Sequence, residues 1–251
     1  MMKQFFILTA ILFATFRLSA QNDLLKQANE AYSKSDFQTA AGLYEQLLKA
    51  NGESATVYYN LGNCYYKLNK VAPSILNYER ALLLEPGDND IRFNLEIAKL
   101  KTVDKIEPVE SFFLTEWFRS IQNLLSTDAW SKFSITCFIL MLIGLFFFFF
   151  SRRVFIKKLG FFIALGLLVG VVLGNSFAYN QKNKLTQRNE AIILTPTITI
   201  KSSPDNSGTD LFILHEGTKI KLKNNKLDDW NEIVTADGNV GWIKSSEFEV
   251  I

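Results

Sequence analysis

The sequence predicts a multidomain membrane protein with three parts: an all-α solenoid of helical repeats, a hairpin of two transmembrane helices and a C-terminal all-β barrel. Three observations lead to this fold class. Two long apolar runs, residues 133–150 and 159–179, lie close together in the chain. The residues before them repeat with a period of 34. The residues after 190 alternate between apolar and polar side chains.

The two apolar runs predict a membrane hairpin. Each is close to the about 20 residues that an α-helix needs to cross the hydrocarbon layer, and neither contains Asp, Glu, Lys, Arg or His. The residues between them hold two arginines, two lysines and no acid, and short loops of this kind stay on the cytoplasmic face. We therefore expect an inner-membrane protein with helices at 131–150 and 159–179, a cytoplasmic loop at 151–158, and both flanking arms in the periplasm.

The N-terminus predicts export independently. An apolar stretch at residues 5–16 follows Lys3 and is too short to span a membrane. The residues that end at Ala20 resemble a signal-peptidase site, so residues 1–20 are interpreted as a secretory signal peptide. Because Leu18 is larger than the residue preferred three positions before the cut, a retained anchor is the alternative.

The arm before the hairpin contains an internal repeat. A period of 34 is typical of tetratricopeptide (TPR) repeats, in which two antiparallel helices approach closely through small residues. Pro86 would end the second copy because it cannot donate the next helical hydrogen bond. A further helix near 90–102 would cover the apolar face left by two repeats. We therefore expect residues 21–105 to form two repeats plus a capping helix. The superposed residues are Ala28-Asn29-x-x-Tyr32 on Gly62-Asn63-x-x-Tyr66, and Tyr44-Glu45 on Tyr78-Glu79.

Repeats of this kind usually bind an extended peptide or a partner helix on a concave surface built by the first helix of each pair. Two alternatives stay open for its residues: Asn29 and Asn63 could instead order the backbone between repeats, and Tyr32 and Tyr66 could serve packing. The expected protein-binding face consists of Leu25, Asn29, Tyr32, Tyr59, Asn63, Tyr66, Lys67 and Phe93.

The segment between the repeats and the first span, residues 106–130, is expected to be a linker with an amphipathic interfacial helix. Between Val109 and Ser126, apolar residues recur at the spacing of one helix face. Trp117 and Trp130 suit the headgroup region, so we expect the helix to lie on the outer leaflet. Docking of the same apolar stripe onto the repeat domain is the alternative.

The second span carries small residues at intervals of four. They would form a flat face that another helix can approach closely, either the first span, a helix of a partner protein or a second copy of this chain. The expected helix-packing residues are Gly166, Gly170, Gly174 and Ala178.

A linker at 180–189 leads to the β domain at 190–251. Isoleucines alternate with polar residues, and Asp237-Gly238 marks a tight hairpin, which predicts five to seven short strands. Glu216-Gly217-Thr218, Trp230 and Gly241-Trp242-Ile243 resemble the bacterial SH3-like domain. Domains of that family bind cell-wall peptide or protein segments, or have no known ligand. We expect Trp230 and Trp242 to be core residues rather than a ligand platform.

Catalysis is not indicated. His215 is the only histidine, the motifs of nucleophilic, zinc and phosphate-binding sites are absent from the sequence, and Cys64 and Cys137 are not expected to meet. Acids and bases are mixed along both arms, which argues against a nucleic-acid partner. We therefore name no catalytic, cofactor-binding or metal-binding residue and expect a non-enzymatic protein.

The whole arrangement of signal, repeats, hairpin and SH3-like domain, with the segments Thr102–Pro108 and Phe112–Thr115, resembles the BatE family of the Bacteroides aerotolerance operon. This resemblance implies a scaffold or adaptor subunit of an aerotolerance or envelope-stress complex. Its partners would be membrane proteins with von Willebrand factor A domains and a MoxR-type ATPase system, beside the lipid bilayer. The alternative is an envelope sensor that binds peptidoglycan through the SH3-like domain.

Overall fold

The computed structural model describes residues 23–107, 109 and 112–251, apart from the side chain of Asn224. The expected signal peptide, 1–20, lies outside the described residues. The chain divides into two compact units. One contains the described residues up to Leu82, those from Asp88 to Val109, and those from Asn189 to Ile251. The other contains Leu83–Gly87 and the described residues between Glu110 and Arg188.

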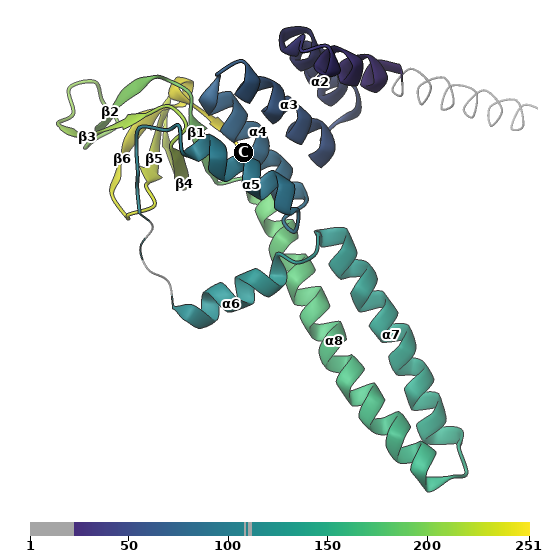
Figure 1. The fold of residues 1–251 in the computed structure, drawn as a ribbon. Coiled ribbons are helices and arrows are strands. Elements are labelled where there is room, and N and C mark those ends of the chain that lie inside the picture. The colour runs from purple at the N-terminus through teal and green to yellow at the C-terminus, as the bar shows by residue number, and fades with distance from the viewer. Residues whose placement is uncertain (1–22, 108, 110–111) are drawn as a thin grey trace, which may run out of the picture. The chain divides into compact units, whose positions relative to one another are not determined.

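Helices of the repeat region form the first part of one unit. Asp36 and Asp88 accept hydrogen bonds from backbone N–H groups at the starts of the helices that follow them, which satisfies donors that have no partner within the helix. Small residues allow close approach: a Cβ on Gly62 would lie 2.7 Å from the ring of Tyr78. The helices are residues 23–33, α2 Phe37–Asn51, α3 Ala55–Lys67, α4 Val71–Leu84 and α5 Asn89–Lys99 (Figure 1).

Seven antiparallel strands form the second part of the same unit, in the order β3-β2-β6-β5-β4-β1-β7. Gly238, at φ +88°, turns the chain between two neighbouring strands, where the Asp237-Gly238 hairpin was expected. The strands are β1 Glu190–Ile193, β2 Thr197–Lys201, β3 Asp210–His215, β4 Lys219–Leu227, β5 Trp230–Val234, β6 Val240–Lys244 and β7 Phe248–Val250, with a 3-10 turn at Ser245–Glu247.

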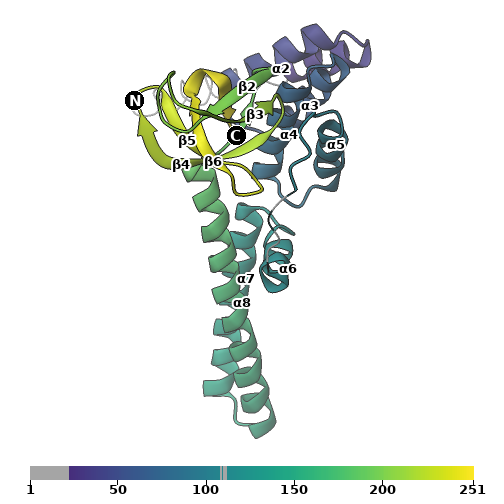
Figure 2. The same cartoon turned by 90° about the vertical axis from the view of Figure 1, so that its left-hand side faces the viewer.

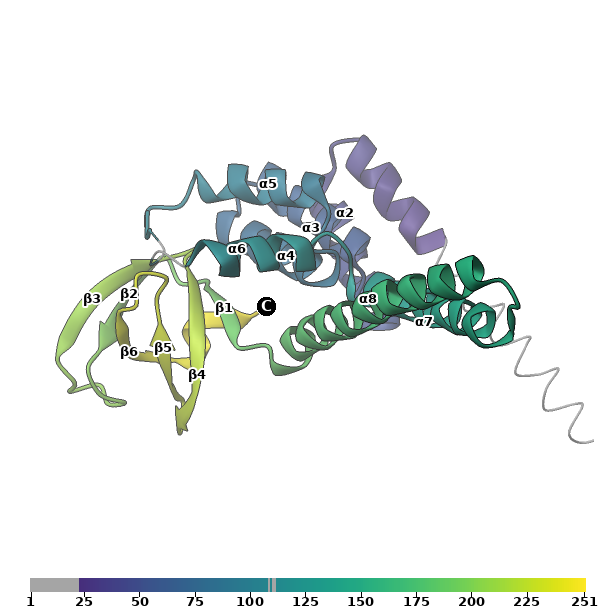
Figure 3. The ribbon, with the colours of Figure 1, turned by 90° about the horizontal axis from the view of Figure 1, so that it is seen from below.

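One buried core joins six of these strands. The sheet is therefore curved around its inner face, as Figure 3 shows. Ile106, from the segment after α5, packs against this core although it precedes the sheet by more than 80 residues. The core side chains are Ala191 and Ile193 from β1, Ile200 from β2, Leu214 from β3, Ile220 from β4, Ile233 from β5 and Ile243 from β6.

The expectation that Trp230 and Trp242 fill this core is wrong. Both are only half-buried, and side chains alternate between the faces of a strand, so the core positions of β5 and β6 belong to Ile233 and Ile243. Trp230 pairs with Lys244, whose Nζ lies 5.3 Å from the ring centroid of the indole. The two tryptophans are diagonal neighbours on the outer face.

The other unit consists mainly of α6 Phe113–Gln122, α7 Thr127–Phe150 and α8 Val154–Gln187 (Figure 1). Both α7 and α8 are long and apolar enough to cross a membrane, with mean hydropathies of 2.6 and 2.2 over 18 residues. They pair as an antiparallel hairpin. Residues 180–187 contain neither Gly nor Pro, so α8 continues through most of the expected linker at 180–189.

Small residues bring α7 and α8 together, but not all the expected ones. A Cβ on Gly160 would lie 2.6 Å from the carbonyl oxygen of Gly144, and a Cβ on Gly174 would lie 3.1 Å from Ser134 Cβ. Gly170 meets Cys137, whereas a Cβ on Gly166 would meet nothing within 4 Å. Gly166 therefore does not belong to the packing face, while Gly170, Gly174 and Ala178 do.

The reason for this difference is the helical repeat. A step of four residues turns 400°, so a row at intervals of four drifts by about 40° per step around the helix. Two packed helices instead contact each other along a row with an average spacing near 3.5 residues. The buried positions of α8, which are 160, 164, 174, 177, 178 and 181, lie along such a row.

Alanine at two glycines of α8 should have opposite effects on the hairpin. Gly160→Ala should lower its free energy of unfolding by about 1–3 kcal/mol, because the new methyl group meets a backbone oxygen that cannot move aside. Gly166→Ala should be neutral, or stabilising by up to about 1 kcal/mol, because it only removes backbone freedom. Unfolding of the full chain in mild detergent measures both. Equal effects would show that Gly160 has no special role.

Candidate functional site

The expected protein-binding face is distributed over three neighbouring helices. Leu25, Asn29 and Tyr32 lie on the helix formed by residues 23–33, and Leu25 and Tyr32 pack against the core that includes Leu61 and Cys64 of α3. On the other side of α3, Asn94 of α5 donates hydrogen bonds to Tyr59 Oη at 2.9 Å and Asn63 Oδ1 at 3.0 Å. The first helices of successive pairs thus lie side by side, as expected for the residues of one face.

The two asparagines of the face have the same structural role in each repeat. Tyr44 donates its hydroxyl to Asn29 Oδ1, and Tyr78 donates to Asn63 Oδ1, each at 2.6 Å and across 15 residues. Burial raises the pKa of Tyr44 to about 12 and raises that of Tyr78 as well, so both hydroxyls keep the proton that they donate. The alternative in which Asn29 and Asn63 order the repeats is therefore supported for their side-chain oxygens.

Tyr66 supplies a second contact on this face that the sequence analysis missed. The ammonium group of Lys101 lies 4.1 Å from the centroid of the Tyr66 ring and donates to Asn69 Oδ1 at 3.3 Å. Lys67 is exposed beside it, and Phe93 exposes 66% of its surface. The half-buried tyrosines thus contribute partly to packing, whereas Phe93 and the lysines are accessible.

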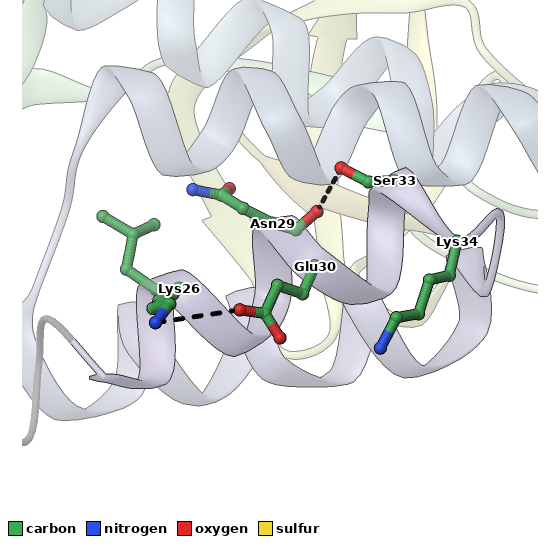
Figure 4. A pocket seen from close by; sticks show the side chains of 6 residues that line it. Lys26, Asn29, Glu30, Ser33 and Lys34 are labelled. Carbon is green, nitrogen blue, oxygen red and sulfur yellow. Dashed lines mark hydrogen bonds and ion pairs between the residues drawn. The ribbon is translucent and has the colours of Figure 1, made fainter.

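An open depression of about 540 Å³ lies at the other end of the face, along the helix formed by residues 23–33. Its described lining contains Leu25 and Asn29, two of the expected residues, together with charged neighbours. Figure 4 shows the ion pair of Lys26 with Glu30, at 4.0 Å, and the hydrogen bond from Ser33 to the carbonyl oxygen of Asn29. Such a shallow, mixed surface suits a peptide better than a small molecule.

The opposite side of the repeats is closed by the sheet. Glu79 of α4 is nearly inaccessible, and its carboxylate lies 2.9 Å from Lys219 Nζ of β4 and 3.3 Å from Lys99 Nζ of α5. Lys219 also pairs with Glu190 at 2.8 Å. Lys219 and Ile192 are register partners, so the buried side chain of Ile192 lies on the same face of the sheet as the lysine that pairs with Glu79 of α4.

Electrostatics keep both members of this pair charged. Burial favours the neutral form of Glu79, but the attraction of Lys219 and Lys99 outweighs it and holds the pKa of Glu79 below its usual value. Burial likewise disfavours the charge on Lys219, yet Glu79 and Glu190 raise its pKa. The pair therefore contributes stability above the ordinary Glu pKa of about 4.3 and loses it as the pH falls through the lower pKa of the folded state.

A second contact ties the segment after α5 to the turn between β3 and β4. Asp104 Oδ2 accepts hydrogen bonds from the backbone N–H of His215 at 2.7 Å and from Thr218 Oγ1 at 2.6 Å, and Oδ1 lies 2.8 Å from His215 Nδ1. Partial burial opposes ionisation, but these hydrogen bonds hold the pKa of Asp104 below its usual value. His215 thus has a structural role here.

A third contact completes this side of the unit. Arg80 of α4 donates through Nη2 to Glu249 Oε1 at 2.8 Å and to the carbonyl oxygen of Val250 at 2.5 Å. Gly217, at φ +84°, leaves no room for a side chain, because a Cβ there would lie 2.7 Å from Thr102 Cγ2. The sheet is therefore attached through α4 and the segment that follows α5, which leaves the expected binding face uncovered by these contacts.

Within the part of the chain that the structure describes, no group of three or more His, Cys, Asp or Glu side chains is placed to hold a metal ion. Cys64 and Cys137 are both buried and unbonded to each other. Burial raises the pKa of the Cys64 thiol to about 12, which keeps it protonated and unreactive at neutral pH.

Comparisons with known proteins support the prediction of TPR repeats in this region. Residues 25–91 match the family model of the tetratricopeptide repeat. The repeat region is a TPR region. No curated protein matches the chain. Among solved structures, the type III secretion translocator chaperone SycD of Yersinia enterocolitica is similar, with 13% identity, coverage of 60% of this chain and 90% of that one, and a TM-score of 0.31.

Removal of the charge on Glu79 should destabilise the first unit. Glu79→Gln leaves Lys219 with only Glu190 and should lower the free energy of unfolding by about 2–4 kcal/mol. Glu96→Gln is the matched control. Glu96 also lies 3.3 Å from Lys99, but its side chain is 65% exposed, so the expected loss is below about 1 kcal/mol. Urea unfolding at neutral pH compares them, and similar losses would refute a special role of the buried carboxylate.

Proposed function

We propose that the chain is a non-enzymatic scaffold that is anchored in a bacterial inner membrane by α7 and α8 and binds protein partners through its TPR region. The observation that carries the proposal is the division of the repeats into two sides. The sheet covers the outer side of α4 through Glu79 and Arg80. The expected protein-binding face, here called the inner face, keeps Phe93 and Lys67 exposed. TPR repeats are protein-interaction modules, which agrees with an adaptor role.

The chemistry of the inner face indicates the kind of partner. The ammonium group of Lys101 lies over the ring of Tyr66, Lys67 is exposed, and Phe93 offers an apolar surface. An extended peptide with an acidic group and a neighbouring apolar side chain would satisfy both. The side-chain nitrogen atoms of Asn29 and Asn63 add hydrogen-bond donors, because only their oxygen atoms are used within the repeats described.

The composition of the first unit supports the proposed membrane topology. Residues on either side of the α7–α8 hairpin pack into one unit, with contacts such as Asp104 to His215. Both flanks must therefore lie on the same side of any membrane that the hairpin crosses, as two spans require. The basic loop at 151–158 favours the cytoplasm for the hairpin's turn and hence the periplasm for the flanks.

We further propose that the curved sheet is an SH3-like domain and that the chain is a BatE-like subunit of an aerotolerance or envelope-stress complex. The seven antiparallel strands around one core, the TPR region and the two apolar helices agree with that arrangement. Its partners would be the membrane proteins with von Willebrand factor A domains and the MoxR-type ATPase system that the family resemblance implies.

A second candidate function is an envelope sensor that binds peptidoglycan. The observation that favours it is the position of Trp230 and Trp242 on the outer face of the sheet, where two neighbouring indole rings could stack on sugar rings. In the scaffold role this pair has no assigned task.

Two pairs of substitutions in the full chain should separate these functions. The double variant Phe93→Ser, Lys67→Ala should greatly reduce the co-purification of protein partners from mild detergent. Both side chains are accessible to a partner, and because they are exposed their loss should not destabilise the fold. Trp230→Ala with Trp242→Ala should leave that co-purification unchanged in a scaffold. A loss of sedimentation with purified cell wall in the tryptophan variant alone would favour the sensor.

Single cysteines should report the orientation. Cysteine at Gln46 or Ser207, both exposed, should react with an impermeant thiol reagent in intact spheroplasts, while cysteine at Ser151 should react only after lysis. The buried native cysteines give little background. Labelling at Ser151 alone in intact cells would reverse the orientation, and different labelling of Gln46 and Ser207 would contradict a hairpin.

A further inference from the structure

The helix α6 presents an apolar face that described residues cover only around Ile121. Phe113, Trp117 and Phe118 expose 69%, 56% and 49% of their surfaces, and Leu114 exposes 43%. At 100° per residue, the apolar side chains of residues 113–125 fall within less than half of the helix circumference. The opposite side carries only polar residues. Exposure of several large aromatic rings on one helix face marks an interaction surface.

Contacts at the end of α6 fix its orientation relative to the hairpin. Trp130 Nε1 and Gln181 Nε2 both donate to the carbonyl oxygen of Gln122, at 2.8 Å and 2.7 Å. Gln181 also donates to the carbonyl oxygen of Leu125 at 2.8 Å. Because Gln122 is the last residue of α6, where backbone carbonyls lack helical partners, the two bonds to it hold the helix end itself, and the bond to Leu125 holds the segment that follows.

The apolar face of α6 is turned toward the apolar part of the hairpin. Ile121 lies in the middle of that face and packs against the cluster of Trp130, Phe177 and Ala178 at the end of α7 and α8. The exposed apolar surface of α7 begins immediately below, at Phe133. Figure 1 shows α6 extending sideways from this end of the hairpin. The apolar surface of α6 is thus continuous with the surface of the two membrane-crossing helices.

The charge of the segment indicates what covers this face. Residues 112–126 contain one acid and one base, Glu116 and Arg119, which form an ion pair at 2.6 Å, so the segment is neutral. It offers no charge for an acidic or basic partner. Its occupant must be apolar and must extend along the side of the hairpin, and the acyl chains of a bilayer meet both conditions.

We propose that α6 lies in the plane of the membrane, in the interfacial region of the leaflet that contains the N-terminus of α7, with its apolar face in the lipid. This inference rests on the proposed crossing of the membrane by α7 and α8. The bonds of Gln181 and Trp130 to Gln122 then set the depth of the hairpin, because α6 cannot enter the hydrocarbon with its polar side and cannot leave it without exposing its rings. The partner is the lipid surface, irrespective of headgroup charge.

Fluorescence quenching by lipids can test this. The full chain, with Cys64 and Cys137 replaced by Ala, would carry one cysteine labelled with an environment-sensitive dye and be reconstituted in phosphatidylcholine vesicles. The sites are Leu114→Cys on the apolar face, Thr115→Cys on the polar face as matched control, and Ile139→Cys on the lipid-exposed surface of α7. A nitroxide is placed on the acyl chain, either near the headgroup or near the terminal methyl group.

The dye at residue 114 should emit at shorter wavelength than the dye at 115 and lose about half or more of its emission to the shallow nitroxide, as an interfacial helix requires. The dye at 139 should be quenched more by the deep nitroxide. If 139 is quenched and 114 is not, the inference about α6 is overturned while the hairpin remains in the membrane. If neither is quenched, the proposed membrane crossing fails as well. If the dye at 114 emits at short wavelength without being quenched, and this emission shifts to longer wavelength when the protein is diluted in lipid, a second copy of the chain and not lipid covers α6.

Discussion

The carboxylate of Glu79 is the constraint on which the first unit depends. A charge that is out of contact with water is stable only when opposite charges and hydrogen bonds replace the water that it has lost. Here the replacements come from two different elements, Lys99 of α5 and Lys219 of β4. Separation of the repeat region from the sheet would therefore break the Glu79–Lys219 ion pair and leave Glu79 with Lys99 alone. This explains why two regions that look like independent modules in sequence form one compact unit.

That attachment also determines which surface of the repeats is available. The sheet is held by Glu79 and Arg80 on α4 and by Asp104 after α5, all on the side away from the expected binding face. On the binding side, the repeated bonds of Tyr44 to Asn29 and Tyr78 to Asn63 fix each helix pair without using the accessible side chains. Rigid helices with accessible Phe93 and Lys67 lose little freedom when a peptide binds, which favours affinity.

Local periodicity made much of this fold predictable. The 34-residue repeat, the two apolar runs and the alternation around Ile198 and Ile220 each report a structure that forms within a short stretch of chain. Predictions failed where a small angular or register difference decides the outcome. Trp230 and Trp242 lie on the face of the sheet opposite the core. Gly166 points away from α7, because a row of residues at intervals of four turns gradually around the helix and leaves the contact row, whose average spacing is about 3.5 residues. Contacts such as Asp104 with His215, 111 residues apart, leave no local pattern that could reveal them.

The residues of the first unit come from both sides of the apolar helices in the sequence, and this order affects how the unit folds during synthesis. Glu79, Asp104 and Ile106 are translated before the apolar helices, whereas Lys219, His215 and the strands around Ile106 are translated after them. The repeat region therefore emerges from the ribosome with Glu79 paired only with Lys99, with Asp104 lacking its partners His215 and Thr218, and with Ile106 lacking a core to enter. Its folding can be completed only after both apolar helices have been made. For the membrane crossing proposed above, correct insertion of the hairpin is thus a precondition for a complete first unit, and a misinserted chain would present an incomplete unit to the proteases of the cell.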